Sequence, residues 1–301
     1  MDDEKVEHDA HIRRKQQAKD SKAADKVDSS KLVAAFDLQQ VLTCPKLSVS
    51  SAYYSRKLNL YNFTILNLQT LQGNCFTWSE HECNRGTNDI ASAVWMWLSD
   101  MEEGAKHVLF YSDCCGGQNR NRIMISTMLK FLCDCKNITT IEHKYFESGH
   151  SKNECDNMHS TIQARYAHRD VFLPSAYHEH MKLAQHTKPY KVSVLDHNDI
   201  FDFCKLNNDI MKKNAFTGIQ KVHHIKFQKE EGLVSVSFAD EIDGDFVLKP
   251  FFKRGKTQSR LRVYDLSKAY HASCGIDDKR EDSRKLAQFL PVDCRPFYFS
   301  F

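Results

Sequence analysis

The order of apolar stretches between residues 31 and 170 constrains the fold more than any other feature. Short apolar runs that fit buried strands alternate there with longer segments whose apolar residues recur at helical spacing. The predicted strands are 32–36, 58–69, 75–80, 107–111 and 139–146, and the predicted helices are about 87–102, 123–132 and 152–168. The Gly73-Asn74 turn makes the second and third strands part of an antiparallel meander.

This order is strand, strand, strand, helix, strand, helix, strand, helix. It predicts an α/β protein with an RNase H-like mixed five-stranded sheet flanked by helices. We assign the core to residues 31–170, and residues 171–301 to a small C-terminal α+β accessory region that is helical first and β-rich near 221–256. Residues 1–30 are densely charged with few large apolar side chains, which fits a disordered tail or a solvated helix, and we take them as a disordered charged tail.

Three aspartates occupy special places in this order. Asp37 ends the first strand, Asp113 follows the fourth, and Asp156 lies in the first two turns of the last helix. In an RNase H-like sheet the first and fourth strands are neighbours, so these carboxylates converge, and their mutual repulsion favours bound cations. Aspartates also occur at such places simply as caps and turns, which explains any one of them equally well. The trio favours a metal site.

The predicted site holds two Mg²⁺ or Mn²⁺ ions bound by Asp37, Asp113 and Asp156. Two ions about 4 Å apart activate an attacking water or 3′-hydroxyl and stabilise the leaving oxygen of a phosphodiester. Glu154 is the fallback third acid, although it points from a different face of the helix than Asp156.

Several motifs carry a family resemblance. The segments FDLQ (36–39), SDCCGGQN (112–119) and GHSKNECD (149–156) resemble an uncharacterised transposase-like domain found in many animal transposon-derived proteins, over roughly residues 36 to 250. That resemblance implies an RNase H-like, DDE/D-type domain in which Asp37, Asp113 and Asp156 are the catalytic acids. It implies divalent-metal-dependent cleavage or strand transfer on DNA by a transposase or nuclease. The alternative is a domesticated, catalytically inactive nucleic-acid-binding or scaffold protein.

Residues near the three acids supply further candidates. Gln118, Asn119 and Arg120 follow the Gly116-Gly117 break and are predicted to contact nucleic acid, the alternative being a structural turn.

Two histidines also lie close to the motifs. His150 is a candidate catalytic residue that shuttles a proton or contacts the scissile phosphate, unless it is a hydrogen-bonded loop histidine. His159, three residues after Asp156 on the same helix face, is a secondary candidate that orients this carboxylate or binds metal.

Composition adds only weak constraints. A formal net charge of +3 neither requires nor excludes DNA as a partner. Eleven cysteines, an odd number spread along the chain, indicate free thiols in a reducing compartment. Because no apolar run is long enough to span a bilayer, we expect a soluble nuclear or cytoplasmic protein without a membrane partner. The sequence is also compatible with a homo-oligomer.

Overall fold

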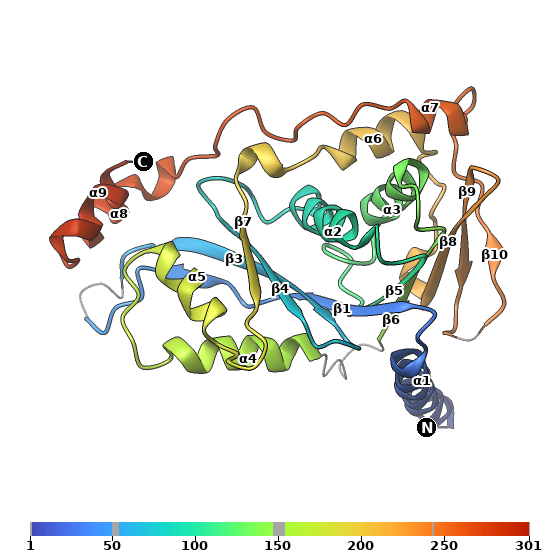
Figure 1. The fold of residues 1–301 in the computed structure, drawn as a ribbon, viewed down its shortest axis with the longest axis horizontal. Coiled ribbons are helices and arrows are strands. Elements are labelled where there is room, and N and C mark those ends of the chain that lie inside the picture. Colours follow the sequence, from blue (N-terminus) through green and yellow to red (C-terminus); the bar gives the residue numbers. More distant parts are fainter. Residues whose placement is uncertain (1, 50–53, 147–153, 243, 301) are drawn as a thin grey trace.

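A computed structural model describes residues 2–49, 54–146, 154–242 and 244–300, with side chains described from residue 12 onward. One mixed sheet of ten strands runs through the molecule in the order β10-β9-β8-β6-β5-β1-β3-β4-β7, and β2 pairs with β3 at the side (Figure 1). The strands are β1 (Leu32–Leu38), β2 (Leu42–Cys44), β3 (Leu58–Asn67), β4 (Gly73–Ser79), β5 (His107–Ser112), β6 (Thr140–Tyr145), β7 (Lys191–Val194), β8 (His224–Glu230), β9 (Leu233–Ala239) and β10 (Val247–Leu248).

The helices cover both faces of this sheet. Figure 1 shows α2, α3 and α6 on one face and α4 and α5 on the other, so the molecule has three layers. The helices are α1 (Asp2–Val27), α2 (Thr87–Met101), α3 (Arg122–Asp134), α4 (Glu154–Tyr166), α5 (Pro174–Lys182), α6 (Phe203–Ile210), α7 (Gln258–Arg262), α8 (Arg280–Ala287) and α9 (Arg295–Phe299). The predicted α/β class, with a mixed sheet flanked by helices, is confirmed.

The five predicted strands are all present as β1, β3, β4, β5 and β6, and the first and fourth of them, β1 and β5, are parallel neighbours. The sheet nevertheless has ten strands rather than five. Beyond residue 170 the chain adds β7 next to β4 at one edge, and then β8, β9 and β10 next to β6 at the other. The segment predicted as an accessory region therefore completes the same sheet.

Alternation along β1 sends its side chains to two different layers. Ala34 and Phe36 belong to the large core beneath α2 and α3, whereas Val33 and Ala35 face the opposite layer with Tyr111. Asp37 follows Val33 and Ala35 at the same period of two, so it lies on the face that α4 covers.

Helix starts follow local capping chemistry. The side chain of Asn121 caps α3 by accepting from the backbone N–H groups of Ile123 and Met124, at 3.0 and 2.9 Å. The N-cap of α2 is Gly86, and its N–H donates to the Asp89 carboxylate at 2.9 Å.

The amino-terminal segment, predicted as a disordered charged tail, is the helix α1, and its last turns dock on the protein. The buried carboxylate of Asp25 accepts from the Lys144 ammonium and the Tyr111 hydroxyl, both at 2.6 Å, and from Lys31 at 2.8 Å. The charge of Asp25 is thus neutralised by groups distant from α1 as well as by Lys31, which composition alone does not show.

The chain crosses the whole sheet between β7 and β8. It does so on the face of α2 and α3, where the α6 residues Phe203 and Leu206 are fully buried and the Phe203 ring lies 5.5 Å from that of Trp95. After α7 the chain returns toward α5, where the Tyr298 hydroxyl donates to the backbone carbonyl of Phe172 at 2.5 Å. None of the helices in the described ranges has the length and apolar character needed to cross a bilayer.

Candidate metal centre

The site begins where the parallel strands β1 and β5 end. Ala35 pairs with Tyr111, and two residues further along the same register Asp37 stands beside Asp113. Asp37 lies on the face that α4 covers, and Asp113, which follows the last residue of β5, is near enough for its charge to raise the pKa of Asp37. Neighbouring strands are about 4.8 Å apart, so the two carboxylates are brought close by the sheet itself.

The helix α4 supplies the remaining groups. Its buried residues Met158 and Ile162 pack it against the sheet, and the Gln39 amide donates to the backbone carbonyl of His159 at 3.4 Å. Asp156 and His159 are three residues apart and therefore lie on the same helix face. One potential ligand atom from each of Asp37, Asp156 and His159 lies within 4.8 Å of the other two.

The ring of His159 is positioned by Thr64, which pairs with Asp37 across β1 and β3. The Thr64 hydroxyl lies 3.2 Å from the backbone carbonyl of Asp37 and 2.8 Å from Nε2 of His159. In the tautomer in which Nε2–H donates to this hydroxyl, the hydroxyl donates to the Asp37 carbonyl and Nδ1 keeps the lone pair that can bind a cation.

Burial and charge shift the titration of this cluster. Burial first, and then the neighbouring charges of Asp113 and Asp156, raise the pKa of Asp37 to about 7. Burial lowers the pKa of His159 to about 4, against the opposing effect of Asp156. The imidazole is therefore neutral at pH 7, as a metal ligand has to be.

Asp113, the third predicted metal ligand, is not part of the ligand group found among the described residues, and it has partners of its own. Its Oδ1 accepts from the Asn119 side-chain amide at 2.5 Å and from the backbone N–H of Cys115 at 3.2 Å. Asn119 is fully buried and faces this carboxylate, so the structure gives it the position of an orienting residue rather than of the predicted nucleic-acid contact.

The two neighbours of Asn119 differ from it. Gln118 is partly exposed, and its backbone carbonyl accepts from Asn121 at 3.1 Å. The guanidinium of Arg120 donates to the carbonyl of Val222 at 3.2 Å and lies 5.7 Å from the centre of the Tyr145 ring. Among the three predicted contacts, Arg120 is thus the one that presents a positioned cation.

Glu154, the fallback acid, is bound by α1. Lys22 and Lys26 contact its two carboxylate oxygens at 2.9 and 3.5 Å, and these ion pairs lower the pKa of Glu154 against the effect of burial. It ties the first turn of α4 to the amino-terminal helix and is absent from the ligand group. The predicted catalytic His150 lies outside the described residues.

Comparison with known proteins places the chain in a family. Residues 54–242, more than half of the chain, match a domain of unknown function (DUF7869). The chain belongs to the DUF7869 family. No curated protein and no solved structure was found to match it.

The DUF7869 segment contains Thr64, Asp113, Asp156 and His159, whereas Asp37 precedes it on β1. The role of Thr64 is a feature that sequence reasoning missed. Its only sequence signal is its place in the alternating strand 58–69, and that strand's register against β1 shows only in three dimensions.

A groove of about 430 Å³ opens from the cluster along α4 and β2. Polar side chains line much of it, including Gln40, Thr43, Ser160 and Gln163 beside Asp37 and Asp156. Two carboxylates and a neutral imidazole at one end of a polar groove could hold a metal ion next to a polar substrate.

Proposed function

We propose that this chain is a divalent-metal-dependent, transposase-type nuclease that cleaves or transfers DNA phosphodiester bonds, with an RNase H-like core. The observation that carries the proposal is that one potential ligand atom of each of Asp37, Asp156 and His159 lies within 4.8 Å of the others, where α4 crosses the carboxyl end of β1. The central strand order β4-β3-β1-β5-β6, with α4 across β1, supports the RNase H-like assignment. The motif resemblance around the three aspartates supports the transposon-derived origin.

The donor set fits a hard or borderline divalent cation. Carboxylate oxygens suit Mg²⁺ and Mn²⁺, and the imidazole nitrogen makes Mn²⁺ the better match of the two. Asp37 carries a carboxyl that is mostly protonated below pH 7, and a bound cation is what would favour its charged form. With Asp113 beside Asp37, a second ion belongs to the same proposal.

The residues of the chain have distinct tasks in this scheme. Asp37 and Asp156 hold the cation, and His159 completes the set through Nδ1 while Thr64 fixes its ring. Asn119 keeps Asp113 oriented toward the site. When bound, the cation would activate the attacking water and neutralise charge that develops on the phosphate.

Nicking of a supercoiled plasmid in Mg²⁺ or Mn²⁺ tests the proposal. Asp37→Asn and Asp156→Asn should each lower the metal-dependent rate at least about 100-fold, because each removes a ligand charge. Asp100→Asn, at an exposed acid near the end of α2, is the matched control and should cleave like the wild type. Equal rates in all four proteins would refute the metal site.

The same experiment separates the alternative function. DNA binding by the wild type without any metal-dependent cleavage would favour a catalytically inactive nucleic-acid-binding protein with this fold. A DNA substrate fits the nuclear or cytoplasmic location expected from the sequence.

A further inference from the structure

A second groove, of about 530 Å³, opens beside the turn that follows Asp113. Its walls come from this turn, from the start of α3 and from residues 213–220, which belong to the segment that crosses the sheet. Three of the residues that line it are the cations Arg120, Arg122 and Lys213. None of the residues that line it is acidic. We call it the basic groove.

The positive charge of the basic groove is not neutralised within the described part of the protein. Arg122 and Lys213 are exposed, and neither forms an ion pair with any described acid. Arg120 is held in place by the Val222 carbonyl and the Tyr145 ring, neither of which cancels its charge. Asn121, Thr217 and Gln220 add hydrogen-bonding groups to the same walls. This combination favours an anion with several acceptor oxygens.

The turn between Asp113 and the basic groove contains two glycines, Gly116 and Gly117, and the packing of the protein does not require either of them. An added Cβ on Gly116 would come no closer than 4.0 Å to its nearest neighbour, the Arg120 carbonyl, and one on Gly117 would meet nothing within 4 Å. Neither glycine has the positive φ that side chains avoid. The fold therefore does not require glycine here, whereas a ligand that passes close to the backbone would.

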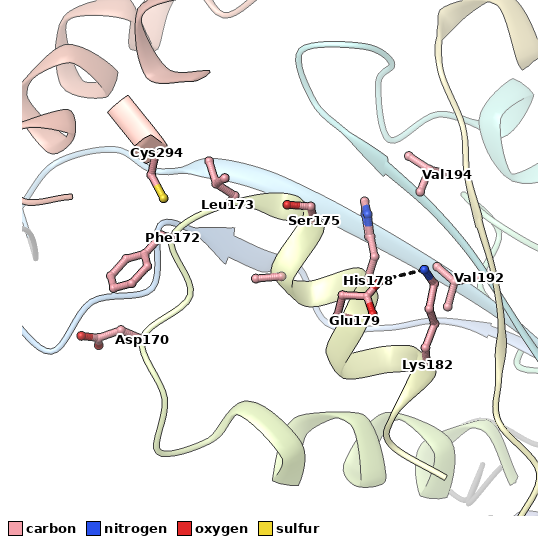
Figure 2. Close-up of a pocket in the computed structure, with 11 residues that line it drawn as sticks. Asp170, Phe172, Leu173, Ser175, His178, Glu179, Lys182, Val192, Val194 and Cys294 are labelled. Atoms are coloured by element: carbon pink, nitrogen blue, oxygen red, sulfur yellow. Dashed lines mark hydrogen bonds and ion pairs between the residues drawn. The ribbon is translucent and has the colours of Figure 1, made fainter. Parts of the chain in front are cut away.

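Another cavity of similar size lacks these properties. It measures about 470 Å³ and lies between α5 and the edge strand β7 (Figure 2). Apolar residues such as Phe172, Val192 and Val194 line it, and two of its charged side chains, Glu179 and Lys182, pair with each other at 2.7 Å. A phosphate would find no such group of unpaired cations there.

We propose that the basic groove binds the phosphodiester backbone of DNA, which reaches it from the metal site across the Gly116-Gly117 turn. This inference rests on the proposed function for the choice of DNA, and it assigns the strand a path along the carboxyl edge of β1 and β5. Phosphate contacts of this kind position a strand without reading its sequence. By binding the neighbouring backbone phosphates, the groove would position the scissile phosphate at the metal site.

Binding measured without catalysis tests the groove. The full chain in EDTA is titrated into a fluorescently labelled 30-base-pair duplex, and anisotropy gives the dissociation constant at several salt concentrations. The double variant Arg122→Ala/Lys213→Ala should bind roughly tenfold more weakly, and its salt slope should fall by about two, because two phosphate contacts are lost.

The matched control is Lys106→Ala/Lys136→Ala. It removes the same charge at two exposed lysines next to the opposite ends of β5 and β6, and it should bind within about twofold of the wild type. Equal weakening of both double variants, or no weakening of the groove variant, would overturn the proposal.

A third variant tests the path across the turn. Gly117→Leu should keep the wild-type melting temperature, since an added Cβ there meets no atom within 4 Å, and it should weaken binding by obstructing the strand. Unchanged affinity at an unchanged melting temperature would overturn this path. A wild-type protein that binds DNA through the groove in EDTA but cleaves no DNA in Mg²⁺ or Mn²⁺ would refute the nuclease alone.

Discussion

Replacing the buried carboxyl of Asp37 by a neutral amide should stabilise the metal-free protein at neutral and alkaline pH. Burial and the nearby charges of Asp113 and Asp156 raise the pKa of Asp37 from 3.8 to about 7. In the unfolded chain the same group ionises near 3.8. Between pH 3.8 and pH 7 the folded protein therefore keeps a proton on this carboxyl that the unfolded chain has lost, and above pH 7 it buries the charged form.

The size of the effect follows from the shift. The difference between 3.8 and about 7 corresponds to a free energy of about 4 kcal/mol. Because the folded pKa is the higher one, the protonated carboxyl stabilises the protein fully below pH 4, and this stability is lost as the pH rises to 7. The amide of Asp37→Asn resembles the protonated form and does not titrate.

Urea unfolding of the wild type and Asp37→Asn between pH 4 and pH 8 measures the difference. The two free energies of unfolding should nearly coincide at pH 4 and differ by about 4 kcal/mol at pH 8, with the variant more stable. All other titrating groups are shared, so the difference isolates this carboxyl. The exposed Asp100→Asn should follow the wild-type profile.

Adding Mn²⁺ completes the test. At pH 8 the ion should stabilise the wild type, by about 2.7 kcal/mol at a concentration 100 times its dissociation constant, and should stabilise Asp37→Asn far less. If the free energies of unfolding of the two proteins changed with pH in parallel, the raised pKa of Asp37 would be refuted. An equal response of both to Mn²⁺ would refute Asp37 as a ligand.

Three further changes probe other contacts. Thr64→Val removes the hydroxyl that orients His159 and should weaken Mn²⁺ binding about 10- to 100-fold by calorimetry, and unchanged affinity would contradict the orienting role. Asp25→Ala leaves Lys144 buried without its carboxylate and should cost about 3–5 kcal/mol in urea unfolding, most of which the double change Asp25→Leu/Lys144→Met should restore. Tyr298→Phe should cost about 1–3 kcal/mol by removing the hydrogen bonds that attach α9, and a loss near zero would show that the carboxy-terminal segment is held by apolar contacts alone.

The central strands were predictable because their signal is local. Apolar runs such as 32–36 and 107–111 specify buried strands by themselves, and the adjacency of β1 and β5 followed from the order of the elements. The edge strands β7 and β10 are short and largely exposed, so their residues carry no comparable apolar pattern. Their place in the sheet depends on distant partners.

The part of the candidate site that depends on the ends of strands could be predicted from the sequence. Asp37 and Asp156 follow from position and motif, whereas the place of His159 depends on a hydroxyl from another strand. Asn119 was predicted to contact nucleic acid, whereas its buried amide donates to Asp113, because sequence does not show which way a polar side chain faces. The docking of α1 was hidden for a similar reason: Lys144, which pairs with Asp25, and Glu154, which pairs with Lys22, lie more than a hundred residues from their partners.

The late return of the chain across the sheet sets an order for synthesis. The strands that carry Asp37 and Asp113 emerge from the ribosome early and can pair at once, and α4 follows them. Lys213 and the rest of the outer wall of the basic groove come from the crossing segment, more than two hundred residues from the start. A nascent chain would therefore bring Asp37, Asp156 and His159 together before the outer wall of the basic groove is made, so the proposed DNA-binding groove would form later than the candidate metal site.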